Sequence, residues 1–130
     1  MAGYRSPLGR ARGLGAAKHG VGQFIAERVT AIALAPLVLW GIWSAILVAR
    51  GGYEDAIGWI TSPVNAVLLS LTLAVGFWHM QVGMRVILED YLENTFGRVV
   101  ALVLNLFVCT VACALAVFSV LKLAFTHGAA

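Results

Sequence analysis

Three long apolar runs without Asp, Glu, Lys or Arg dominate the pattern of this chain. They cover residues 29–49, 56–84 and 99–121. The hydrocarbon core of a bilayer needs about 20 apolar residues in a helix, so each run can cross it once. Lipid admits only helices and closed barrels, and these runs lack the apolar–polar alternation of barrel strands. The pattern therefore predicts an all-α membrane protein with three transmembrane helices.

Glycine, serine and proline positions suggest where the three helices begin and end. Gly51 and Gly52 provide a stop after the first apolar run. Ser62 can serve as the N-cap of the second helix, with Pro63 in its first turn. Pro36 lies inside the first helix, where a proline removes one backbone hydrogen bond and favours a kink. The expected spans are 24–50, 63–92 and 98–125.

Composition and charge agree with this assignment and orient the helices. The chain has 130 residues, of which 61% are hydrophobic and only 12% are charged, whereas soluble domains carry about 25% charged residues. Seven of the nine cations lie on the side of the N-terminus: five are in or next to a basic arm over residues 1–23, and two flank the connection between the second and third spans. These cations are Arg5, Arg10, Arg12, Lys18, Arg28, Arg85 and Arg98, against Arg50 and Lys122 on the other side.

The positive-inside rule then predicts a cytoplasmic N-terminus and a periplasmic C-terminus. The net charge of +3 is explained by this topology and by anionic lipid headgroups, and it does not require a nucleic-acid partner. The first apolar run is too long and too far from the N-terminus for a cleavable signal peptide. Many glycines and a single serine in the arm disfavour a mitochondrial transit peptide, so we expect a bacterial inner membrane rather than a mitochondrial one.

A histidine inside the second run is the main candidate for chemistry. His79 lies about 7–8 Å inside the cytoplasmic boundary of the apolar slab. At about 100° per residue it shares one helix stripe with Gly83, Val86 and Asp90. Gly83 removes a side chain one turn away, which a flat ligand such as haem would need, and imidazole is a common haem ligand. An interhelical hydrogen bond and a proton or substrate pathway are the alternatives for His79.

Asp90 and Tyr91 follow His79 by about 17–18 Å along the same helix. This level suits the polar headgroup of a quinone, because a phenol can donate a hydrogen bond to a quinone carbonyl and a nearby carboxylate can orient it. Tyrosines are also common as interfacial anchors, and the acidic residues here can simply be solvated. From spacing alone, both interpretations stay open.

These residues together resemble a known family. The stretch HMQVGMRVILEDY is similar to the haem-and-quinone helix of the small hydrophobic membrane-anchor subunit of succinate dehydrogenase (complex II), the cytochrome b-type anchor D chain. The stretch ERVTAIAL, near the start of the first helix, resembles the Arg-x-Thr-Ala pattern of that family. The family's three-span layout and cytoplasmic N-terminus also agree with the topology expected here.

The resemblance implies specific roles. The chain would be a non-catalytic subunit that anchors the flavoprotein and iron–sulfur subunits in a complex that oxidises succinate and reduces ubiquinone. With the larger cytochrome b anchor subunit it would bind haem b and the quinone. His79 would be one axial ligand of the haem iron, Gly83 would line the haem face, and Arg28 would lie near a haem propionate. Tyr91 would donate a hydrogen bond to the quinone, with Asp90 beside it.

Two rival functions remain from the sequence. The first is a purely structural anchor of a respiratory complex, in which His79 bonds only to a neighbouring helix. The second is a small transporter subunit with His79 in a proton path. Transporters tend to show inverted repeats or paired broken helices, and neither pattern is found in this sequence.

Overall fold

The computed structural model describes residues 6–8 and 20–127, so most of the basic arm lies outside the described residues. Three helices make up the described chain: α2 (Gly20–Thr61), α3 (Pro63–Tyr91) and α4 (Thr95–His127). Each is long and apolar enough to cross a membrane. The predicted all-α fold with three helices long and apolar enough to span a membrane is therefore confirmed.

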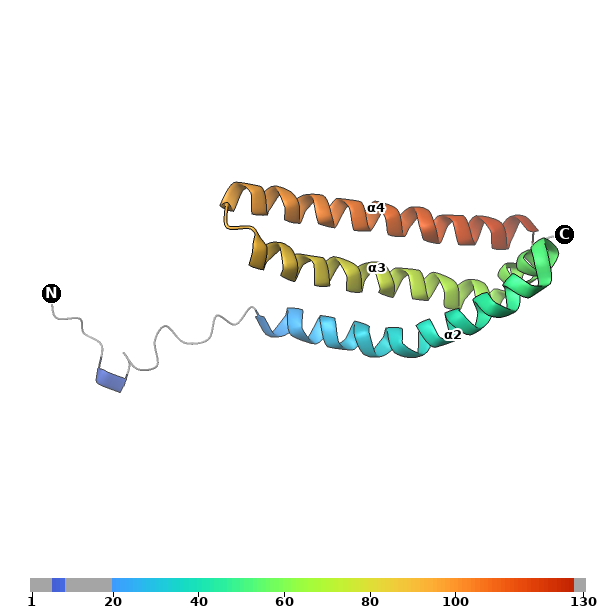
Figure 1. The fold of residues 1–130 in the computed structure, drawn as a ribbon, viewed down its shortest axis with the longest axis horizontal. Coiled ribbons are helices and arrows are strands. Elements are labelled where there is room, and N and C mark those ends of the chain that lie inside the picture. The colour runs from blue at the N-terminus through green and yellow to red at the C-terminus, as the bar shows by residue number, and fades with distance from the viewer. Residues whose placement is uncertain (1–5, 9–19, 128–130) are drawn as a thin grey trace.

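Helix α3 lies between α2 and α4, and the helices alternate in direction along their shared long axis (Figure 1). Its start is the predicted one: Ser62 is the N-cap and Pro63 begins the helix, although the Ser62 side chain makes no capping hydrogen bond. Helix α4 begins earlier than expected because Asn94 caps it. The Asn94 Oδ1 accepts a hydrogen bond from the Phe96 backbone N–H at 3.1 Å, as an N-cap side chain does.

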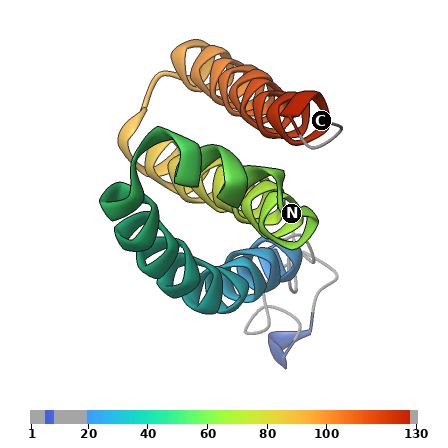
Figure 2. The same ribbon diagram turned by 90° about the vertical axis from the view of Figure 1, so that its right-hand side faces the viewer.

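The connection between the first two spans differs from a simple loop. Helical structure resumes directly after Gly52, whose φ of 85° and ψ of −166° break the helix at the predicted stop. This conformation is accessible almost only to glycine. The following segment crosses one end of the bundle (Figure 2), and its Trp59 stacks on Trp40 of α2 with ring centroids 5.6 Å apart. Trp59 thus has an aromatic packing partner within the chain.

Very few side chains of the described chain are shielded from its surroundings. Among the described residues, the buried apolar ones are limited to Ala66, Val82, Cys109 and Val120. Large apolar side chains such as Ile32, Leu39 and Phe107 are 74%, 70% and 64% exposed. Such a surface is unfavourable in water but suits lipid tails and neighbouring membrane subunits. The three helices therefore form a thin layer with most of its apolar surface available to partners.

Candidate functional site

The contact between α2 and α3 centres on His79. Its Nδ1 lies 2.9 Å from the Thr30 Oγ1, which is within hydrogen-bond distance. His79 is half-buried, and Thr30 is on the neighbouring helix. The interhelical hydrogen bond considered for this histidine is therefore present, and it uses only one of the two ring nitrogens.

The surroundings of the Thr30 hydroxyl indicate the direction of this bond. The hydroxyl also lies 2.8 Å from the Ala26 carbonyl oxygen and 3.1 Å from that of Glu27, both in the preceding turn of α2. A hydroxyl has one proton and two lone pairs. If its proton goes to these carbonyls, the oxygen accepts the N–H of Nδ1. The Nε2 of His79 then carries a lone pair.

An open groove of about 480 Å³ borders His79. The rest of its lining comes from α2, and all of it is apolar: Ala31, Leu34, Ala35, Val38 and Leu39. One turn from His79 along α3, a Cβ added to Gly83 would meet no atom within 4 Å. Alanines beside the ring and an open position at Gly83 leave room for a flat group against this face.

The donor set limits which metal centre the chain can contribute to. Within the described ranges 6–8 and 20–127, no three His, Cys, Asp or Glu side chains gather as a metal site. A lone imidazole suits a macrocycle whose iron already has four ligands, better than a bare ion that needs three or four protein ligands. These residues therefore fit a haem that takes one axial ligand from this chain.

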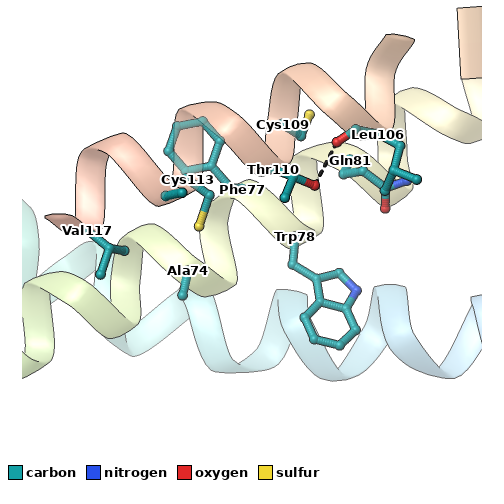
Figure 3. Close-up of a pocket in the computed structure, with 10 residues that line it drawn as sticks. Ala74, Phe77, Trp78, Gln81, Leu106, Cys109, Thr110, Cys113 and Val117 are labelled. Carbon is teal, nitrogen blue, oxygen red and sulfur yellow. Dashed lines mark hydrogen bonds between the residues drawn. The ribbon is translucent and has the colours of Figure 1, made fainter. Parts of the chain in front are cut away.

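A second hollow, of about 670 Å³, lies between α3 and α4 and does not include His79. Figure 3 shows its lining, which is mainly apolar, with Trp78 and Phe77 from α3 and Cys113 and Val117 from α4. The Thr110 hydroxyl in this lining donates to the Leu106 carbonyl of its own helix at 2.7 Å. We assign no ligand chemistry to this hollow.

The other predicted site residues lie apart from His79. Arg28 precedes Thr30 by two residues, or about 200° of helix rotation, so it leaves α2 on another face. Its guanidinium lies 5.2 Å from the centroid of the Phe24 ring, a cation–π contact. Asp90 and Tyr91 lie at the end of α3, and Tyr91 is 82% exposed. The roles of these residues in haem or quinone binding stay predictions.

Comparison with known proteins identifies the family. Residues 2–118 match the family described as succinate dehydrogenase/fumarate reductase transmembrane subunit. This chain belongs to that family. A succinate dehydrogenase hydrophobic membrane anchor subunit from Rickettsia conorii is 30% identical over 91 residues, covering 69% of this chain and 72% of the relative. One from Rickettsia bellii is 28% identical over 105 residues, covering 80% and 84%.

Membership in the succinate dehydrogenase/fumarate reductase transmembrane subunit family confirms the resemblance inferred from the sequence. The chain is a multi-pass membrane protein and an anchor subunit of succinate dehydrogenase, associated with the other subunits of that complex. A similar anchor subunit occurs in Reclinomonas americana, 26% identical over 90 residues. The exposed apolar surface of the three helices agrees with a protein that is completed by neighbouring subunits.

The partners in two interhelical hydrogen bonds were not predicted from the sequence. Thr30 was noticed only as part of the stretch ERVTAIAL, and the structure makes it the partner of His79. Asn105 of α4 donates its Nδ2 proton to the backbone carbonyl of Gln81 in α3 at 3.0 Å. In both cases the available signal was a hydrogen-bonding side chain inside a charge-free span, where a partner on another helix is expected.

Proposed function

We propose that this anchor subunit contributes an axial ligand to haem b and part of the ubiquinone site of a succinate:quinone oxidoreductase in a bacterial inner membrane. Electrons from succinate would reach ubiquinone through the flavoprotein and iron–sulfur subunits, which this chain helps to hold at the membrane. The observation that carries the proposal is the half-satisfied imidazole: His79 lies within a membrane span and, among residues 6–8 and 20–127, is hydrogen-bonded through its Nδ1 only, to Thr30.

The haem part of the proposal assigns each residue a physical task. His79 offers the Nε2 lone pair to the iron, and the larger cytochrome b anchor subunit supplies the second ligand. Gly83 and the alanines of the groove leave space for the flat face of the macrocycle. Arg28 is a charged donor at the cytoplasmic end of α2 that can pair with a propionate. When bound, haem b supplies a one-electron redox centre within the membrane.

The quinone part depends on the end of α3. Tyr91 stands about 18 Å from His79 along the helix axis and presents its phenol away from the chain. The neighbouring Arg85 and Glu89 neutralise each other in a 2.8 Å ion pair. The carboxylate of Asp90, exposed beside Tyr91, is then the group placed to orient the phenol or relay a proton, while the phenol donates to a quinone carbonyl.

The topology belongs to the same proposal. The excess of cations at the N-terminus and around the α3–α4 connection puts both in the cytoplasm, where the soluble subunits lie, and the C-terminus in the periplasm. This orientation places Tyr91 and Asp90 at the cytoplasmic membrane surface, close to the subunits that deliver electrons.

The test uses the complex purified through a tag on this chain. We expect the flavoprotein, iron–sulfur and larger anchor subunits to copurify, and His79→Ala to remove the haem b absorbance while the subunits still copurify. An assembled His79→Ala complex with an unchanged haem spectrum would reject the ligand role. That result would favour the purely structural anchor, in which the Thr30 bond alone explains the histidine.

A further inference from the structure

Thr30 is the one residue outside α3 that is hydrogen-bonded to the imidazole of His79 among the described residues. We propose that Thr30 is a positioning residue for the haem ligand: its hydroxyl accepts the Nδ1 proton of His79 and thereby keeps Nε2 deprotonated and available to iron. This inference rests on the proposed function, because it assumes that His79 binds haem.

The argument begins with the single hydroxyl proton. At 2.8 and 3.1 Å, the Ala26 and Glu27 carbonyls can share it. The Thr30 oxygen then has a lone pair that can accept the Nδ1–H of His79. In this arrangement both the Thr30 hydroxyl and the His79 Nδ1 have hydrogen-bond partners. In the opposite arrangement the hydroxyl donates to Nδ1, so the proton of the neutral ring sits on Nε2.

The groove decides between the two arrangements. Its lining beside His79 consists of Ala31, Leu34, Ala35, Val38 and Leu39, none of which has a side-chain acceptor. An N–H on Nε2 facing such side chains would lack a partner, and the hydrocarbon of a bilayer offers no acceptor in its place, so this arrangement is unfavourable. A protonated Nε2 also cannot bind iron. Ligation therefore requires Thr30 to act as the acceptor.

The bond also has an electronic consequence. A hydrogen bond from the distal N–H of a ligating histidine orients the ring and raises the basicity of the ligating nitrogen. A more basic nitrogen stabilises ferric haem more than ferrous haem. Removing the acceptor should therefore raise the haem midpoint potential. A merely structural role of Thr30 in helix packing predicts no such shift in an assembled complex.

The experiment compares Thr30→Val with Thr30→Ser and Thr72→Val in the purified complex. Valine has nearly the shape of threonine but lacks the hydroxyl, and serine restores it. Thr72 is the matched control, because its hydroxyl donates at 2.7 Å to Leu68 within α3 and does not contact His79. The haem midpoint potential is measured by optical redox titration, and the signal of low-spin ferric haem is measured by electron paramagnetic resonance.

We expect Thr30→Val to change the ratio of the site's affinities for ferric and ferrous haem by about threefold. For a one-electron centre this corresponds to a rise of about 28 mV in the haem midpoint potential. Thr30→Ser and Thr72→Val should keep the wild-type potential and resonance signal. Loss of haem from an assembled Thr30→Val complex, with haem retained in the other two, would also support the role. If Thr30→Val does not assemble, Thr30→Ala is titrated in its place with the same expectation.

An unchanged potential and resonance signal in the hydroxyl-free variant would overturn the inference, as would an equal shift in Thr72→Val. The haem content of His79→Ala separates this failure from failure of the proposed function. If His79→Ala loses haem while Thr30→Val behaves as wild type, only the positioning role is rejected. If His79→Ala retains haem with its spectrum unchanged, the ligand role itself is rejected.

Discussion

The two helix contacts of α3 use polar groups in different ways. Toward α4, the Asn105 amide is paired at both ends: its Nδ2 donates to the Gln81 carbonyl at 3.0 Å, and its Oδ1 accepts from the Cys109 thiol at 3.4 Å. Toward α2, His79 is paired through Nδ1 only, in the described part of the chain. An amide with a partner at both its nitrogen and its oxygen holds two helices together, whereas an imidazole paired at one nitrogen beside an apolar groove keeps the capacity to bind a ligand.

The two hollows beside α3 also differ in the polar groups that line them. The larger one, between α3 and α4, is lined mostly by apolar side chains, and the hydroxyl of Thr110 in it is used within its own helix. The lining of the smaller one, between α2 and α3, includes His79. Volume alone therefore does not indicate which hollow could bind a haem, because binding of iron depends on an available lone pair.

Filling the space at Gly83 should have the largest effect that distinguishes the α2 contact of α3 from its α4 contact. We expect Gly83→Leu to abolish haem binding, because a Leu side chain would occupy the room left for the macrocycle, and its Cβ would meet no atom within 4 Å. Haem content of the purified complex is the measurement. Gly41→Leu is the matched control, since that glycine of α2 also faces open space. Equal haem content in both variants would contradict a haem face at Gly83.

A smaller effect is expected at the far end of α3. Tyr91→Phe should preserve assembly and haem content but lower succinate–quinone turnover about two- to tenfold, as expected from losing one hydrogen bond of about 0.5–1.5 kcal/mol. Succinate oxidation with an artificial acceptor serves as the control, because it bypasses the quinone site. Unaltered quinone turnover would remove Tyr91 from that site.

The smallest effect is expected on the α4 side. Asn105→Leu should reduce the stability of the helix packing by about 0.6 kcal/mol, a typical value for an interhelical hydrogen bond in a membrane protein. Thermal dissociation of the complex measures this change, with the haem potential as the second readout. A shift of the potential as large as that of Thr30→Val would show that the two contacts of α3 are not functionally distinct.

Much of the fold could be predicted from local sequence. Charge-free runs mark membrane helices because the cost of burying charge in hydrocarbon acts on each span independently. The break at Gly52 and the start of α3 at Pro63 also follow from local backbone preferences. His79 was a candidate for the same reason, since an ionisable ring in a span needs a partner wherever the helix lies.

The pairing of residues from different helices was decided by the tertiary structure. Whether His79 meets Thr30, and whether Trp59 folds back onto Trp40, depends on the rotation and relative height of helices that are far apart in sequence. Hydropathy contains no information about either quantity, because all faces of these helices are apolar. In the described part of the chain, packing of the three helices sets the geometry in which one imidazole nitrogen of His79 is hydrogen-bonded and the other is not.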